Sequence, residues 1–282
     1  MRFLEFQIKV LFIAFITTII CSMGIIPILK KLKVGQIERD DGPSSHLRKQ
    51  GTPTMGGIII SLSIIIVSIL VIFYYYHTDA KVAMRIIPLL LVTIGFGTIG
   101  FIDDFKKLIL RNTKGLKPAY KMLGLLTISV LYALFLVKGS ELGIETYIPI
   151  IRKFLKMSVL IYIPFAIFVM LATTNAINLT DGVDGLSTSV CTIIITCLTV
   201  IGIIFDVKEV VIFGSIVVGA CLGFLLFNLH PAKIFMGDTG SLLLRRCYKC
   251  ISIIFKNAFN NNSNCIYPCY RDFICNNASN IF

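Results

Sequence analysis

The chain has 282 residues, of which 56% are hydrophobic and 15% are charged, and its formal net charge is +12. Soluble domains average about 45–50% apolar residues even when glycine is counted, so this composition excludes an ordinary soluble domain. The excess lies in runs close to the roughly 20 residues with which a helix crosses a bilayer. Alternating segments of roughly ten residues, typical of a transmembrane barrel, are not visible. We therefore predict an all-α, polytopic transmembrane helix bundle.

Seven membrane-spanning helices are predicted before residue 240. They cover about Val10–Leu29, Gly56–Tyr76, Ile86–Ile102, Ala119–Val137, Val159–Ala176, Ser187–Phe205 and Val210–Leu229. The first run is longer than the apolar part of a signal peptide and lacks a small-residue cleavage site. We therefore interpret it as a helix of the bundle.

Positive charge is concentrated in two loops, which argues against a nucleic-acid interface. The loops after spans one and three are rich in lysine and arginine, whereas the loop after span two has only Lys81 and Arg85. Short loops rich in these residues face the cytoplasm, so the N-terminus is predicted outside. Loop 138–157 opposes this orientation, because it holds Lys138, Arg152, Lys153 and Lys156 on the predicted outer side.

Four acidic, glycine-rich clusters follow spans one, three, five and seven, and therefore share one side of the membrane. They are Asp40-Asp41-Gly42 running into Gly51–Gly57, then Phe101–Asp104, Asn178–Gly185 and Phe235–Ser241. Carboxylates are costly near lipid and mark functional sites there. We predict that the clusters converge on one cytoplasmic site for a divalent cation and a phosphorylated substrate.

Asp103 and Asp104 are predicted to end the third span, ahead of a basic run. Neighbouring helical residues point about 100° apart, so the pair does not form one chelating fork. One carboxylate could approach a metal or nucleophile while the other orients it. The alternative is a helix end that exposes two acids to water beside Lys106 and Lys107. The basic run to Lys121 could likewise clamp a phosphate or only set the topology.

The other clusters also allow two interpretations. Glycines beside Asp181 and Asp184 permit close approach of a ligand, although an ordinary turn has similar residues. Phe235 could stack on a nucleobase, and Asp238 could hold Mg²⁺ together with substrate phosphates. The alternative for Asp238 is a helix cap. Gly51–Gly57 is not a nucleotide-binding P-loop, and it could be a simple membrane-entry turn.

Together the clusters resemble the motifs of the polyprenyl-phosphate hexose-1-phosphate transferases. Within that superfamily the chain is similar to the phospho-N-acetylmuramoyl-pentapeptide transferases. The resemblance rests on the strings Asp40–Gly57, Phe101–Asp104, Asn178–Leu186 and Phe235–Leu242. The Pro53-Thr54-Met55-Gly56-Gly57 variant favours this branch over the N-acetylglucosamine-1-phosphate branch, which remains an alternative.

The resemblance implies a magnesium-dependent phosphoglycosyl transferase of peptidoglycan synthesis in the bacterial inner membrane, with its active site toward the cytoplasm. Its substrates would be UDP-N-acetylmuramoyl-pentapeptide and undecaprenyl phosphate, and its products the lipid-linked sugar (lipid I) and UMP. The implied catalytic residues are Asp103, Asp104 and Asp238, with Asp238 as the Mg²⁺ ligand. The implied substrate-binding residues are Lys49, Thr54, Lys107, Lys121, Asn178, Asp181, Asp184, Asn228 and Phe235. Family members are often homodimers.

The resemblance is expected to end near Leu242, which divides the chain into a transferase domain at 1–242 and a tail at 243–282. Relatives continue with about three more spans, giving about ten in all, and a loop with clustered histidines. Here the tail is rich in asparagine and holds five cysteines, at 247, 250, 265, 269 and 275. A shifted reading frame, a lineage-specific tail and a zinc site are the open interpretations.

Two further functions stay open from the sequence alone. A cation-coupled transporter would also place acids in a helix bundle, but near the bilayer midplane and not at span ends. An inactive remnant of a transferase would follow from the absent histidine loop.

Overall fold

The computed structural model describes residues 2–32, 52–110, 115–138, 145–148, 153–156, 158–172, 184–245 and 247. Its elements in chain order are α1 (Arg2–Lys31), α3 (Gly57–Thr78), α4 (Ala80–Leu110), α5 (Pro118–Lys138), β1 (Glu145–Ile148), β2 (Lys153–Lys156), α6 (Val159–Ala172), α7 (Leu186–Ile204) and α8 (Lys208–Asn228). Residues 237–245 form a further short helix. The predicted helical bundle is confirmed.

Six of the seven predicted spans are found among the described residues as helices that could cross a membrane. Within the described ranges, six helices are long and apolar enough to cross a membrane. The exception is the predicted span Val159–Ala176, because α6 has only 14 residues and the end of that span lies outside the described residues. The remaining six predicted spans each match one of the six helices.

A small β-hairpin departs from the all-α prediction. Strands β1 and β2 pair antiparallel between α5 and α6, with Thr146 opposite Leu155 and Tyr147 opposite Phe154. Aromatic and β-branched residues favour such pairing, and this signal was overlooked because the segment was interpreted only as a charged loop. The hairpin also contains Lys153 and Lys156, which had opposed the predicted orientation.

Helix α8 occupies the centre of the bundle. It packs against α1, α3, α4 and α7, and it is the most deeply buried of the six described helices that could cross a membrane. Small residues permit this position: a side chain at Gly219 would overlap the Leu11 carbonyl of α1, and one at Gly223 would come within 2.7 Å of the Phe15 carbonyl. Small residues of this kind let transmembrane helices approach closely.

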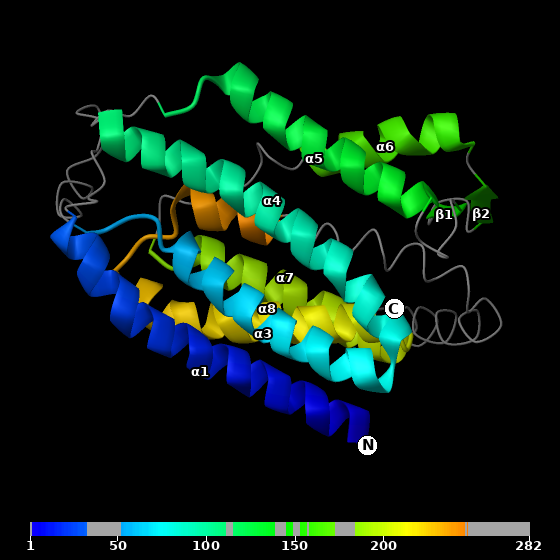
Figure 1. Ribbon diagram of the computed structural model, residues 1–282, viewed down its shortest axis with the longest axis horizontal. Helices are drawn as coiled ribbons and strands as arrows, with labels where there is room; N and C mark the ends of the chain where they lie inside the picture. The colour runs from blue at the N-terminus through cyan, green and yellow to red at the C-terminus, as the bar shows by residue number, and fades with distance from the viewer. Residues whose placement is uncertain are drawn as a thin grey trace, which may run out of the picture.

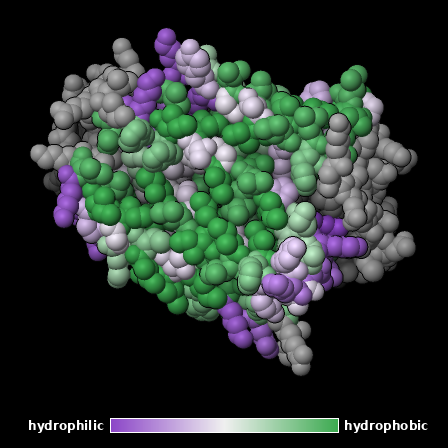
Figure 2. Space-filling model, viewed as in Figure 1, coloured by the Kyte–Doolittle hydropathy of each residue, from purple (hydrophilic) through white to green (hydrophobic). Residues whose placement is uncertain are grey.

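Helix α1, by contrast, faces outward along much of its length. Phe12, Ile16 and Ile20 are more than half exposed, and α1 is the least buried of the six described helices that could cross a membrane. Figure 2 shows hydrophobic residues over the middle of one face of the molecule and hydrophilic residues toward its edges. Such a surface suits contact with lipid hydrocarbon, which agrees with a multi-pass membrane protein.

The helices alternate in direction, so the end of α4 and the starts of α3, α5 and α7 lie near the end of α8 (Figure 1). This end also holds the described parts of all four sequence clusters. The first and fourth clusters pair through their backbones, because Gly56 N–H donates to the Phe235 carbonyl at 2.8 Å and Gly57 N–H donates to the Met236 carbonyl at 2.8 Å. The predicted convergence on one end of the bundle therefore holds for the described residues.

Gly57 is required where α3 meets the 237–245 helix, since an added Cβ would overlap the Gly240 backbone. We predict that Gly57→Ala costs about 1–3 kcal/mol, typical of overpacking. The melting temperature should then fall by about 2–4 °C per kcal/mol. Thermal unfolding of the purified protein in detergent measures this shift.

The matched control is Gly24→Ala in α1, because nothing lies within 4 Å of a Cβ built there. Alanine is the better helix former, so this variant should unfold at the wild-type temperature or slightly above it. Equal melting temperatures for both variants would contradict the proposed close approach at Gly57.

Candidate active site

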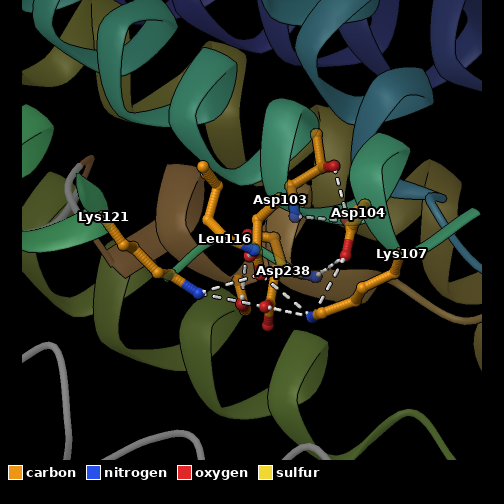
Figure 3. Close-up of polar contacts among 8 residues, drawn as sticks. Asp103, Asp104, Lys107, Leu116, Lys121 and Asp238 are labelled. Carbon is orange, nitrogen blue, oxygen red and sulfur yellow. Dashed lines mark hydrogen bonds and ion pairs between the residues drawn. The ribbon is translucent and has the colours of Figure 1, made fainter. Parts of the chain in front are cut away.

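Three carboxylates meet where α4 contacts the 237–245 helix (Figure 3). Asp103 and Asp104 come from α4, and Asp238 comes from the start of the short helix. Each residue offers one oxygen, and these oxygens all lie within 4.8 Å of one another. Asp103 and Asp104 are 3% and 7% exposed. The acids are therefore buried, and the alternative of two acids exposed to water is wrong.

The position of the two acids within α4 also differs from the prediction. The third span was expected to end at about Ile102, but α4 continues to Leu110. Because Lys107 lies one turn after Asp103 on this continued helix, its ammonium group reaches back to the acids. Hydropathy alone ended the span early, since charged residues lower it even where the helix continues.

Two lysines bridge Asp103 and Asp238. The Lys107 Nζ lies 2.9 Å from Asp103 Oδ2 and 2.7 Å from Asp238 Oδ2. The Lys121 Nζ, on the first turn of α5, lies 3.1 Å and 3.0 Å from the same two oxygens. Buried charges are tolerated only when they are paired and hydrogen-bonded, so these lysines make the acidic cluster possible.

The lysines also keep Asp238 ionised. Burial alone would raise the pKa of Asp238, but the hydrogen bond with Asp103 and the positive charges of Lys121 and Lys107 lower it by more. The pKa of Asp238 therefore lies well below its usual value. A carboxylate that stays negative at neutral pH can serve as a cation ligand.

A turn between α4 and α5 fixes the orientation of Asp103. The backbone N–H of Leu116 donates to Asp103 Oδ1 at 2.7 Å. The turn has a left-handed residue at Gly115, with φ of +51°, and a Cβ there would lie 2.6 Å from the same oxygen. A glycine is thus needed for the backbone to approach the carboxylate.

The hydrogen-bond donors to Asp104 lie at the start of the 237–245 helix. Asp104 Oδ2 accepts hydrogen bonds from Thr239 N–H at 2.8 Å and from the Thr239 hydroxyl at 2.7 Å. Its Oδ1 accepts one from Asp238 N–H at 3.2 Å. The distance from Lys107 Nζ to Asp104 Oδ1 is 3.9 Å, much longer than its distances to the other two acids. The adjacent acids therefore have different surroundings.

The segment from Pro53 to Gly57 forms the backbone wall of the site. Besides the two bonds from Gly56 and Gly57, the Pro53 carbonyl accepts a hydrogen bond from Phe235 N–H at 2.8 Å. Met55 in this segment is 3% exposed and has a left-handed φ of +71°. Thr54, a predicted substrate contact, is half-buried beside it. The segment is more than the simple membrane-entry turn that the sequence allowed.

A second polar pair joins the segment after α8 to the segment before α7. His230 Nδ1 lies 3.1 Å from Asp184 Oδ2, and the imidazole is 86% exposed. Sequence reasoning did not assign His230 to the site. Its place after the seventh span, beside an acidic cluster, was the available signal, but the pairing with Asp184 spans 46 residues.

Asn228 anchors the chain that leads to Phe235. Its Oδ1 accepts a hydrogen bond from the Thr188 hydroxyl at 2.7 Å, and its Nδ2 donates to the Ile234 carbonyl at 2.9 Å. Asn228 is 4% exposed, so both ends of its amide are used inside the protein. Phe235 itself is half-buried. The predicted contacts Lys49, Asn178 and Asp181 lie outside the described residues.

The donor set fits a divalent cation. Hard oxygen ligands suit Mg²⁺, which is usually held by one or two carboxylates together with substrate phosphates. Asp103 and Asp238 turn oxygens toward the same two ammonium groups, and Asp238 remains negative. Asp104 has its oxygens turned to backbone and hydroxyl donors. Asp103 and Asp238 thus direct oxygens toward one point, which the ammonium groups of Lys107 and Lys121 also face.

The chain is similar to known proteins over most of its length. The model of the family described as glycosyl transferase family 4 matches residues 86–256, and the phospho-N-acetylmuramoyl-pentapeptide-transferase signature 1 matches residues 49–60. A relative with that transferase name from Halalkalibacterium halodurans is 43% identical over 247 residues, which are 87% of this chain and 74% of the relative. One from Caldicellulosiruptor bescii is 41% identical, with 88% and 74% covered. One from Acetivibrio thermocellus is 42% identical, with 89% and 73% covered.

The predicted boundary at Leu242 falls within the family match and within a helix. The family match continues to residue 256, and the helix that starts at residue 237 continues across the predicted boundary. Leu243, Leu244 and Arg245 are each at most 1% exposed, so this part of the predicted tail belongs to the core. Cys247 is also buried, with its Sγ 3.6 Å from Thr93 Oγ1, and the other tail cysteines lie outside the described residues.

Replacing Lys121 with Met removes one positive charge from Asp238 and should raise its pKa toward the usual value of about 3.9. A depressed pKa in the folded state stabilises the protein above the pKa of the unfolded state, and this contribution is lost as pH falls. We expect a loss of about 1–3 kcal/mol at pH 7, because a buried charged group loses a hydrogen-bond donor. The loss should shrink below about pH 4, and melting curves at several pH values measure it.

Lys117→Met is the matched control, since Lys117 is exposed and makes no ion pair among the described residues. Its melting temperature should follow that of the wild type at every pH. If the loss of melting temperature in Lys121→Met stays the same from pH 7 down to about pH 2, where the contribution of a carboxylate with a depressed pKa is being lost, the lysine does not act through the charge of the carboxylates.

Proposed function

The chain belongs to glycosyl transferase family 4, within its phospho-N-acetylmuramoyl-pentapeptide transferases, and we propose that its acidic site makes lipid I. The substrates are UDP-N-acetylmuramoyl-pentapeptide and undecaprenyl phosphate. An oxygen of the lipid phosphate forms a bond to the phosphorus that carries the sugar, the bond from that phosphorus to the UMP oxygen breaks, and UMP leaves. The cluster of Asp103 and Asp238 under two lysines is the observation that supports this chemistry most directly.

Transfer of a phosphoryl group depends mainly on alignment and charge neutralisation. Lys107 and Lys121 bring two positive charges to one point, where three donors on each ammonium can hold phosphate oxygens. We propose that they hold the phosphates of the two substrates, as the sequence motif implies. Because a phosphate monoester is largely ionised at pH 7, the attacking oxygen needs orientation more than proton removal. Asp103, fixed by Leu116 N–H, is proposed to supply that orientation.

Asp238 is the proposed Mg²⁺ ligand, because its depressed pKa keeps it ionised and its oxygen faces the lysines. Asp103 is the second candidate ligand. When bound, the ion neutralises charge on the phosphates and on the departing UMP oxygen. The carboxylates position that charge, and the lysines add to it.

The nucleotide is proposed to bind beside Phe235, whose ring is half-buried. Asp184 and Thr54 are proposed to contact the substrate as well, and Lys49, Asn178 and Asp181 complete the proposed set from outside the described residues. Asn228 takes part by anchoring the segment before Phe235, because its amide already bonds to Thr188 and Ile234. The membrane is proposed to be the bacterial inner membrane, with the site toward the cytoplasm, since the lysine-rich loops adjoin this end.

The muramoyl branch is preferred over the N-acetylglucosamine-1-phosphate branch because the matching signature covers residues 49–60. A transporter is disfavoured because Asp103 and Asp104 lie near the C-terminal end of α4 and Asp238 lies at the start of the 237–245 helix, at one end of the bundle and not near its middle.

The chain reconstituted in lipid nanodiscs should convert UDP-N-acetylmuramoyl-pentapeptide and undecaprenyl phosphate to the lipid-linked sugar and one UMP each. Product is measured by extraction of labelled lipid and by release of UMP. EDTA should abolish turnover and added Mg²⁺ should restore it. Asp238→Asn should lower kcat by at least about 100-fold, because an essential charge is lost.

Lys117→Met serves here as the variant with normal turnover. A well-folded chain that releases no UMP with both substrates and Mg²⁺ present would contradict the proposed function and favour the inactive remnant. Full activity of Asp238→Asn would refute only the assignment of this residue.

Phe235→Leu should remove ring stacking on uracil, which is worth about 1–3 kcal/mol per base. The KM for the UDP substrate should rise by roughly 5- to 100-fold, while the KM for undecaprenyl phosphate stays the same. Phe235→Tyr keeps the ring and should preserve both KM values. A rise in the KM for the lipid alone would place Phe235 at the other substrate.

A further inference from the structure

We infer that Asp104 is a positioning residue, which holds Asp238 in place by capping the 237–245 helix, and not a catalytic residue beside Asp103. The sequence had grouped both neighbouring acids as catalytic. The inference rests on the proposed function, because Asp238 is taken as part of its active site.

The oxygens of Asp104 are occupied by donors from one short segment. Asp238 N–H binds Oδ1, and Thr239 binds Oδ2 through both its N–H and its hydroxyl. With 7% exposure, Asp104 has little surface left for a ligand. The lysines have their short contacts with Asp103 and Asp238, and Lys107 is 3.9 Å from Asp104. Among the described residues, Asp104 is thus the one acid of the three that takes its hydrogen bonds from backbone and hydroxyl donors without a short lysine contact.

The backbone N–H groups that donate to Asp104 belong to the first turn of the 237–245 helix. The first N–H groups of a helix have no partner within it, and a carboxylate nearby is favourable because of the helix dipole. Here the cap comes from another helix, α4, and not from the residue before the first turn. A cap from α4 ties the position of Asp238 directly to that of Asp103.

The backbone of α4 also lies close to the start of the 237–245 helix. Gly100 lies one turn before Asp104, and a Cβ there would come within 2.5 Å of the Asp238 carbonyl. Gly237 has a left-handed φ of +72°, and a Cβ on it would lie 2.8 Å from Asp104 Oδ2. Residues four apart share one face of a helix. Gly100 and Asp104 therefore form one face that receives the turn at 237–239.

The adjacent position, Asp103, points to the other side. Neighbouring helical side chains diverge by about 100°, so one acid can face the lysines while the next faces the scaffold. Asp103 shares its face with Lys107, which lies four residues later and bonds to it. Asp103 thus faces the lysines, where the phosphates are proposed to bind, and Asp104 faces the 237–245 helix.

Thr239 gives a test that leaves all three acids in place. Thr239→Val has nearly the same shape but lacks the hydroxyl that donates to Asp104, and Thr239→Ser keeps a hydroxyl as its matched control. In nanodiscs, Thr239→Val should lower kcat by about 10-fold and Asp104→Asn by about 10- to 100-fold, as supporting residues of a site do. The KM of both substrates should change by less than about threefold, since binding contacts remain. Thr239→Ser should keep kcat within about twofold of wild type.

The double variant decides between the two roles. If Asp104 acts through Thr239, then Thr239→Val should change kcat by less than about twofold once Asp104→Asn is present. The same cycle is repeated with the affinity for Mn²⁺ alone, measured by the electron paramagnetic resonance of the free ion. The two changes should again be less than multiplicative, and Asp238→Asn should weaken Mn²⁺ binding more than Asp104→Asn does.

Three results would overturn the inference: normal kcat and Mn²⁺ affinity for Thr239→Val, effects that multiply in the double variant, or Mn²⁺ binding lost as fully in Asp104→Asn as in Asp238→Asn. Melting temperatures of all variants separate these results from misfolding, and Thr239→Ser supplies a folded reference. If the wild type forms no product, the proposed function fails, and the Mn²⁺ cycle still tests the role of Asp104.

Discussion

The site depends on how three neighbouring carboxylates, two of them buried and one half-buried, are held together at the end of a membrane bundle. Each acid needs compensation, because an unpaired charge in this setting costs several kcal/mol. Two lysines compensate Asp103 and Asp238, and backbone and hydroxyl donors compensate Asp104. Each of these partners comes from a different part of the chain: the end of α4, the start of α5 and the turn before residue 240. The ends of the helices must therefore meet in one arrangement for the charges of the acids to be compensated.

Glycines make that meeting possible. Side chains at Gly57, Gly100 or Gly240 would overlap or crowd the backbone of a neighbouring segment. At this end of the bundle, α3, α4 and the 237–245 helix therefore touch backbone to backbone. Close contact at these points shortens the distances over which the acidic side chains must reach. Glycines of the first and fourth clusters are thus explained by packing as well as by access for a ligand.

The sequence predicted the helical bundle, the shared end of the four clusters and the family. These follow from hydropathy and from short motifs, which are local signals. It did not predict that α4 continues past Asp104, because charged residues lower hydropathy whether or not the helix ends. It also missed the hairpin, whose aromatic and β-branched residues lie in a segment interpreted only as a charged loop. The pairing of His230 with Asp184 was missed because a contact across 46 residues leaves no local signal. The different tasks of two adjacent acids could not be assigned either, since that depends on which neighbours face each side of α4.

The continuation of α4 to Leu110 has a consequence for the geometry of the acids. Had the helix ended at Ile102, each acid could have turned independently on a flexible end. Inside an unbroken helix their angular phase is set by the helix itself, at about 100° per residue. A one-residue insertion or deletion in α4 upstream of the pair would rotate both carboxylates around the axis by about 100°, so that one acid would take the place of the other and the second would face a different neighbour. The spacing from the membrane-embedded part of α4 to Asp103 is therefore as strict a requirement as the identity of the acids.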